Sequence, residues 1–232
     1  MHRLKILLVR HGLSAWNEEQ RHQGHCWHEP GLSEQGRKQA DRLGVYLKDE
    51  PIIAIWTSPL PRTRQTSAII HQYQLRAKTI PLLLDSGLME ISHGIADGML
   101  FTEIKEQLAE GWEKMRNRVW HEPLFPGGES PAAASKRMLQ TKFAIARIAS
   151  VFKKNSRIQD GIIVVVAHGA VNNFFLCEIT DTPLDQGWEK FPQDNCCINT
   201  VIWDDREGKF EIESVNKTDH LGDLKYTPII EA

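Results

Sequence analysis

Short aliphatic runs separated by longer amphipathic stretches are the main pattern along the chain. Three runs are continuously apolar, at residues 6–9, 52–56 and 162–166. Runs of this length without alternation are typical of strands buried on both faces of a parallel sheet. Helical spacing follows at about residues 34–48 after an N-cap at Ser33, beyond Arg62, at about 131–152 and beyond Gly169. This alternation of strands and helices predicts an α/β protein, a three-layer α/β/α sandwich around a mostly parallel central sheet.

The remaining elements are expected to flank this framework. Residues 80–84 read as a short edge strand because Pro81 has no amide hydrogen to donate. Residues 198–203 and 209–215 predict a closing hairpin, and about 102–120 predict a helix interrupted near Gly111. We expect one domain over residues 1–232, with about 85–130 forming a helical lid over the sheet rather than an independent domain.

Polar residues follow each of the three apolar runs. Arg10, His11 and Gly12 follow the first, residues 58–62 the second, and His168 with Gly169 the third. The carboxyl ends of neighbouring parallel strands meet at one edge, where open α/β sheets place their ligands. Two imidazoles and the guanidiniums of Arg10 and Arg62 would therefore converge there.

This set of side chains favours chemistry on an anion. Arginine presents a planar fork of donors that suits phosphate or carboxylate oxygens. Helices starting after Gly12 and Gly169 could aim backbone N–H groups at the same anion, and Gly12 would let the backbone come close to the ligand.

The two histidines could divide the work of phosphoryl transfer. One would attack phosphorus as a neutral imidazole and become phosphohistidine, while the other donates hydrogen bonds to the equatorial oxygens. An acid must protonate the leaving oxygen. Glu90 is the best placed candidate for that acid, with Glu129, Asp97 and Asp85 as alternatives.

Six motifs occur in an order that resembles one known family. They are Leu-Val-Arg-His-Gly at 8–12 with Ser14 and Asn17, Arg-His-Gln-Gly at 21–24, Leu-Ser-Glu-Gln-Gly at 32–36, the segment 58–66, Gly-Gly-Glu-Ser at 127–130 and Ala-His-Gly at 167–169. Together they resemble the histidine phosphatase superfamily, which has the phosphoglycerate-mutase-like fold. The resemblance implies that His11 is the phosphorylated nucleophile, Arg62 the second phosphate arginine, Glu90 the proton donor and His168 the second histidine.

The resemblance implies a metal-independent phosphomonoesterase, a phosphoric monoester hydrolase that needs no cofactor and acts on a small phosphorylated metabolite. Leu13 departs from the acidic residue common in the family, which leaves the substrate open. The Tyr- and Arg-rich insert of glycolytic mutases is not evident, which favours hydrolysis over a cofactor-dependent phosphoglycerate mutase. A weakly catalytic phospholigand-binding module is the third alternative.

The expected site has a catalytic and a phosphate-binding part. We expect His11, Glu90, His168, Arg10 and Arg62 to carry out catalysis, and the phosphate to be bound by Arg10, Asn17, Arg21, Gly24, Arg62 and Gly169. Asn17 could instead cap a helix, and Arg21 could instead form an ion pair.

Composition narrows the protein class. The chain is 41% hydrophobic and 25% charged with a formal net charge of -2, and no basic run indicates nucleic-acid or membrane-surface binding. No stretch approaches the roughly 18 apolar residues of a membrane span, and no signal-peptide pattern precedes the first strand, so we expect a cytoplasmic monomer or homodimer.

The spacing of the cysteines predicts no disulfide framework, and the spacing of the clustered histidines predicts no metal site. Four cysteines are too few and too irregularly spaced for a disulfide framework, so reduced thiols are expected. The group His22, His25, Cys26 and His28 fits no tetrahedral zinc spacing, and we expect no metal site there.

Overall fold

The computed structural model describes residues 4–154, 161–204 and 207–226. Its centre is a sheet with the strand order β3-β2-β4-β1-β5-β6. The strands are β1 (Leu4–Arg10), β2 (Ile52–Thr57), β3 (Leu82–Leu84), β4 (Gly161–Ala167), β5 (Ile198–Asp204) and β6 (Lys209–Lys217). β1, β2, β3 and β4 run parallel, while β5 pairs antiparallel with β1 and with β6. The predicted parallel sheet, edge strand and closing hairpin are confirmed.

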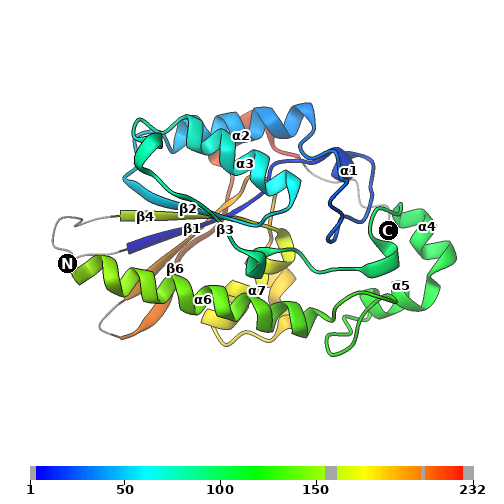
Figure 1. Ribbon diagram of the computed structural model, residues 1–232. Helices are drawn as coiled ribbons and strands as arrows, with labels where there is room; N and C mark the ends of the chain where they lie inside the picture. The colour runs from blue at the N-terminus through cyan, green and yellow to red at the C-terminus, as the bar shows by residue number, and fades with distance from the viewer. Residues whose placement is uncertain (1–3, 155–160, 205–206, 227–232) are drawn as a thin grey trace.

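Helices cover both faces of the sheet. α2 (Glu34–Tyr46) and α3 (Pro61–Gln72) lie on one face, and α6 (Pro131–Lys154) and α7 (Gly169–Ile179) lie on the other (Figure 1). The side chain of Ser33 accepts a hydrogen bond from the amide of Gly36, so it caps α2 as expected. The three-layer α/β/α sandwich is therefore confirmed.

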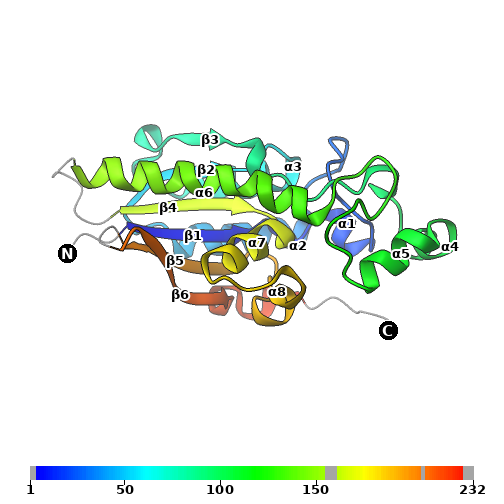
Figure 2. The same ribbon diagram turned by 90° about the horizontal axis from the view of Figure 1, so that it is seen from below.

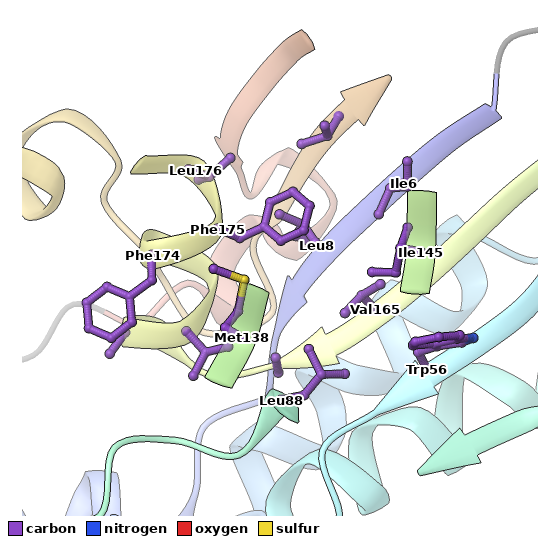
Figure 3. Close-up of a cluster of buried hydrophobic side chains, with 14 of the residues drawn as sticks. Ile6, Leu8, Trp56, Leu88, Met138, Ile145, Val165, Phe174, Phe175 and Leu176 are labelled. Atoms are coloured by element: carbon purple, nitrogen blue, oxygen red, sulfur yellow. The ribbon is translucent and has the colours of Figure 1, made fainter. Parts of the chain in front are cut away.

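The central strands are apolar throughout because both faces are buried. Ile6 and Leu8 of β1 join the cluster under α6 and α7, which includes Met138 and Phe174 (Figure 3). Leu7 and Val9 point the other way and pack with residues of α2 and α3, including Leu43 and Ile70. Successive side chains of a strand face opposite sides, so one short run supplies two cores.

Residues about 85–130 lie beyond the carboxyl ends of β1 and β4 (Figures 1 and 2). They contain two 3₁₀ turns, η2 (Ser86–Leu88) and η3 (Gly94–Ala96), and two helices, α4 (Phe101–Gln107) and α5 (Ala109–Arg116). A small apolar cluster of their own includes Ile104 and Phe125. That this segment acts as a lid stays a prediction.

The predicted helix is interrupted as expected, but three residues before Gly111. The helix breaks at Leu108, whose φ and ψ are -126° and 44°, and Gly111 lies inside α5, which ends at Arg116. A Cβ at Gly111 would lie 2.3 Å from Cδ1 of Phe125. The glycine therefore lets α5 pack closely on Phe125 rather than ending the helix.

Four short elements have no counterpart in the predicted pattern. They are α1 (Ala15–Glu18), η1 (Ala77–Thr79), α8 (Leu184–Lys190) and η4 (Asp219–Leu224). Segments this short carry too few residues for a periodic apolar pattern.

All four cysteines are free thiols, as expected. Among the described helices, none combines the length and apolar character that crossing a membrane requires.

Candidate active site

The carboxyl ends of three adjacent strands bring the predicted residues together. The amide of His11 donates to the carbonyl of Ala167 at the end of β4, and the amide of Ser58 donates to the carbonyl of Val166. The rings of His11 and His168 meet edge to face, with their centroids 5.3 Å apart. His11 and His168 are more than 150 positions apart in the chain, and they meet because neighbouring parallel strands end at the same edge of the sheet.

Hydrogen bonds define the state of His11. Nδ1 lies 2.7 Å from the carbonyl oxygen of Gly12, and Nε2 lies 3.2 Å from Nε of Arg62. An arginine can only donate, so Nε2 accepts and Nδ1 carries the proton; this tautomer is assigned from the network. Burial, followed by the charges of Arg62 and Arg10, holds the pKa of His11 well below its usual range. His11 is therefore neutral at neutral pH, with its Nε2 lone pair toward Arg62.

Arg62 is held rigidly although it is fully buried. Nη1 lies 2.6 Å from Oε2 of Glu29, and the backbone amide of Arg62 donates to Oε1 of the same carboxylate at 3.0 Å. Nη2 donates to the carbonyl of Gly24. Both partners of the ion pair have side chains only 1% exposed. A buried charge needs such a partner, and Glu29 supplies it.

Two buried nitrogen atoms at this edge have no hydrogen-bond partner within the described part of the chain. Nε2 of His168 lies 2.8 Å from Oγ of Ser58, which itself accepts from the amide of Leu60. The Ser58 hydroxyl has a second lone pair, so it can either donate to Nε2 or accept from it; the first arrangement places the proton of His168 on Nδ1. That Nδ1 and Nε of Arg10 are buried without a hydrogen-bond partner in the described structure. Because buried N–H groups normally have partners, the pair fits the oxygens of a bound anion.

The other contacts of these two side chains fix their place. Nη1 of Arg10 donates to the carbonyl of Gln193 at 2.6 Å. Burial, then the charge of Arg62, lowers the pKa of His168 well below its usual range, with smaller effects from His11, Arg10 and His25. His168 is thus neutral beside two guanidiniums.

Glu90 lies at the first turn of α7. Its Oε1 accepts from the amide of Ile91 at 3.0 Å, and its Oε2 accepts from the amide of Ala170 at 3.3 Å. It also interacts electrostatically with Arg10. The residue predicted as proton donor therefore contacts the first turn of α7 at Ala170, which follows His168 by two positions.

Gly12 has a packing role that the sequence did not indicate. A Cβ at this position would lie 2.6 Å from the carbonyl oxygen of Gly36, so the glycine permits close packing on α2, while its approach to a ligand stays a prediction. The helix after it, α1, has four residues, and Ser14 caps it by accepting from the amide of Asn17. Because that first turn is capped by the chain itself, the expected anion site at this helix start is not formed.

Asn17 and Arg21 take the contacts that their alternative roles describe. Oδ1 of Asn17 accepts from the amide of Ser14, which completes a capping box. Arg21 pairs with Glu19 at 2.6 Å and donates to the carbonyl of Gly98. Their contact with a phosphate stays a prediction.

The two predicted glycines lie against the arginines. Gly24 has a φ of +44°, and a Cβ there would collide with the carboxylate of Asp97. Its carbonyl is bound to Arg62. A Cβ at Gly169 would lie 3.6 Å from Nε of Arg10. Gly24 therefore requires a residue without a side chain, whereas a Cβ at Gly169 would make only ordinary van der Waals contacts.

Sequence reasoning missed one residue that shapes the site and left a second one open. Glu29 fixes Arg62, but it stands in a polar loop between His28 and Pro30, and no local pattern distinguishes it. Asn195 donates from Nδ2 to the carbonyl of His11 at 3.1 Å. From its place before the closing strands, Asn195 could be either a turn residue or a phosphate contact, and the phosphate contact stays a prediction.

Comparisons with known proteins agree with this geometry. The sequence model of the Histidine phosphatase superfamily (branch 1) matches residues 6–218. Phosphoserine phosphatase 1 of Hydrogenobacter thermophilus is 31% identical over 221 residues, which cover 95% of this chain and 96% of the relative. A probable phosphoglycerate mutase, GpmB of Erwinia tasmaniensis, is 28% identical, covering 85% and 84%. The solved structure of Bacillus stearothermophilus YhfR has a TM-score of 0.76 and 28% identity, covering 94% of this chain and 99% of that one.

Proposed function

The chain belongs to the histidine phosphatase superfamily, and we propose that it hydrolyses a small phosphomonoester through a phosphohistidine on His11. One observation carries the proposal: the unprotonated Nε2 of a buried, neutral His11 lies 3.2 Å from the guanidinium of Arg62. A nucleophile beside a fixed cation is what attack on a phosphate ester requires.

In the first step, Nε2 of His11 attacks phosphorus and the bond from phosphorus to the ester oxygen breaks. Arg10 and Arg62 hold the phosphoryl oxygens, and Nδ1–H of His168 donates to them as negative charge builds. Glu90, protonated for this step, gives its proton to the leaving alcohol. Such general acid catalysis contributes about 10²- to 10⁴-fold in rate.

In the second step, water attacks the phosphohistidine. The Glu90 carboxylate accepts a proton from this water, the N–P bond breaks, and inorganic phosphate leaves. Side chains supply every proton and charge in both steps, so we propose that the reaction needs no metal and no cofactor. Residues about 85–130 would act as a lid, since Glu90 belongs to that segment.

The substrate proposed for the first test is phosphoserine, supported by the relative named phosphoserine phosphatase. Phosphoglycerate mutase activity is the second candidate, supported by the relative named a probable mutase. A binding module without catalysis would have no use for a neutral nucleophile, a second histidine and an acid in one site.

The test combines product release with trapping of the intermediate. Phosphate release is measured over a panel of phosphorylated metabolites that includes phosphoserine, with and without chelator. The phosphorylated enzyme is trapped by rapid quenching in acid or in alkali, and the phosphate bound to the protein is then measured. We expect chelator-resistant release and an acid-labile, alkali-stable phosphate on His11. Isomerisation of phosphoglycerate primed by bisphosphoglycerate would favour the mutase. Tight binding of phospholigands without phosphate release would overturn the proposal.

A further inference from the structure

The main chain that carries Glu90 is bound to α6 by one arginine. Nη1 of Arg137 lies 3.3, 2.9 and 2.9 Å from the carbonyl oxygens of Ser86, Gly87 and Met89. Nη2 lies 3.2 Å from the carbonyl oxygen of Glu90 itself. One side chain thus contacts four carbonyls in five consecutive residues.

A second contact one helical turn further along α6 holds the start of the same segment. Oγ1 of Thr141 donates to Oδ2 of Asp85 at 3.0 Å, and Oδ1 of Asp85 accepts from the amide of Gly87. Arg137 and Thr141 are four positions apart and share one face of the helix. A Cβ at Gly87 would lie 2.2 Å from Oγ1 of Thr141, so the glycine allows this close approach.

Glu129 and His25 complete the surroundings of the Glu90 main chain. Oε1 of Glu129 lies 2.6 Å from Nη2 of Arg137 and also accepts from the amide of Ser92. Nε2 of His25 lies 2.5 Å from the carbonyl oxygen of Glu90 and 3.6 Å from Oε1 of Glu129. The Glu90 carbonyl is therefore held from two sides, by groups that are distant in the sequence.

These contacts matter because the Glu90 carboxylate has few anchors of its own. It accepts from two backbone amides, and neither bond involves a charged donor. The segment between β3 and α4 has no sheet or long helix to orient its carbonyls. An arginine has five donors in a fixed plane and no acceptor, so it suits several carbonyls converging on one point.

We propose that Arg137, paired with Glu129, is a positioning residue that sets the main chain so that the Glu90 carboxyl group reaches the leaving oxygen. This rests on the proposed role of Glu90 as the acid. Arg137 touches neither histidine in the described structure and takes no part in bond making. Its effect on the reaction passes through Glu90.

The test compares leaving groups, because protonation matters only when the leaving oxygen is basic. kcat/KM is measured for 4-nitrophenyl phosphate, with a good leaving group, and for an alkyl phosphate, with a poor one, in the wild type, Glu90→Gln, Arg137→Ala and the double variant. We expect Arg137→Ala to reduce the alkyl rate at least about tenfold more than the aryl rate, a part of the full acid effect. In the Glu90→Gln background, Arg137→Ala should cost less than about threefold, since a positioning role disappears with the group it positions.

Arg42→Ala is the matched control. Arg42 also projects from a helix and binds a 3₁₀ segment through a carbonyl, that of Leu221, and a carboxylate, that of Asp223. It should lower thermal stability without altering the ratio of alkyl to aryl rates. Arg137→Lys is the second variant if Arg137→Ala does not fold; a lysine keeps the charge but loses the fork, and it should shift the ratio in the same direction by a smaller factor.

The outcomes separate the two proposals. Suppose Glu90→Gln lowers kcat/KM for the alkyl phosphate more than for the aryl phosphate, but the Arg137 variants lower both equally. That result leaves the role of Glu90 intact and overturns the positioning role of Arg137. Additive losses in the double variant overturn it as well. Absence of a leaving-group effect in Glu90→Gln overturns the role of Glu90 and, with it, that of Arg137.

Discussion

Nε of Arg62 donates a 3.2 Å hydrogen bond to Nε2 of His11, the atom proposed to attack phosphorus. The contact keeps Nε2 unprotonated, because a proton on Nε2 would face a cation at hydrogen-bonding distance. Arg62 is itself fixed by Glu29, so the arrangement exists before any substrate binds. Fixed donors and charges of this kind lower the barrier because they need not reorganise during the reaction.

Replacing the nucleophile should remove activity without unfolding the protein. His11→Asn keeps a polar side chain of smaller size but cannot form the phosphohistidine, so turnover of 4-nitrophenyl phosphate should fall at least about 10³-fold. His121→Asn, at an exposed histidine, is the control and should retain activity. Steady-state kinetics with circular dichroism as a folding check decides the matter, and near-normal turnover in His11→Asn would refute the mechanism.

Glu29→Gln should weaken both the fold and the phosphate site. It leaves the Arg62 guanidinium buried without its counter-charge, a loss of about 3 to 5 kcal/mol for buried pairs. For a chain of this size, that corresponds to a Tm lower by about 10 °C. The KM for substrate should rise as well, because Arg62 loses its fixed position.

The matched variant is Glu19→Gln, which breaks an ion pair of the same 2.6 Å length at the surface, where Glu19 has a side chain 50% exposed. Exposed pairs contribute about 0 to 1 kcal/mol. Calorimetry of both variants should therefore give very different shifts, and similar shifts would show that Glu29 is not essential to the site.

His22 should make the fold sensitive to acid. Burial lowers its pKa to about 4, and its ring packs against that of His93 with the centroids 3.9 Å apart. As pH falls below about 6.5, the unfolded chain takes up a proton at this histidine that the folded chain does not. The free energy of unfolding therefore falls between pH 6.5 and 4, by about 2 kcal/mol at pH 5 from this group alone.

Urea unfolding of the wild type and His22→Phe at pH 7.5 and pH 5 measures this effect. The variant should lose about 2 kcal/mol less than the wild type over that interval. Some acid sensitivity will remain, since burial also lowers the pKa of His93. His121→Gln should follow the wild type, and a parallel fall in wild type and His22→Phe would contradict the prediction.

Gly36→Ala should destabilise the protein although alanine is the better helix former. The new Cβ would lie 1.8 Å from the carbonyl oxygen of Leu13, and a backbone atom cannot rotate away. We expect a loss of about 2 kcal/mol or more, as in other overpacked sites. Gly44→Ala in the same helix meets ring atoms of Tyr73 at 2.3 Å rather than backbone, and a side chain can shift more easily than backbone, so it should cost less than Gly36→Ala. Denaturant unfolding of the two variants checks the contrast.

Most strands and helices of the fold could be predicted from the local sequence pattern. The continuous apolar runs predicted β1, β2 and β4, and Pro81 correctly marked an edge strand. Ser33 correctly predicted the start of α2 as its N-cap. The break near Gly111 was misplaced because glycine has two uses, ending a helix or allowing another element to approach, and the sequence does not distinguish them.

The sequence by itself determined which residues could do chemistry: a histidine or arginine directly after each buried strand, and an acid on the following loop. Only the tertiary structure decided how they are held. Glu29 reaches Arg62 across 33 positions, and Arg137 reaches the Glu90 carbonyl across 47. Periodicity and capping are properties of about ten neighbouring residues, whereas the partner of a buried charge is chosen by whichever side chain the folded backbone brings within about 3 Å.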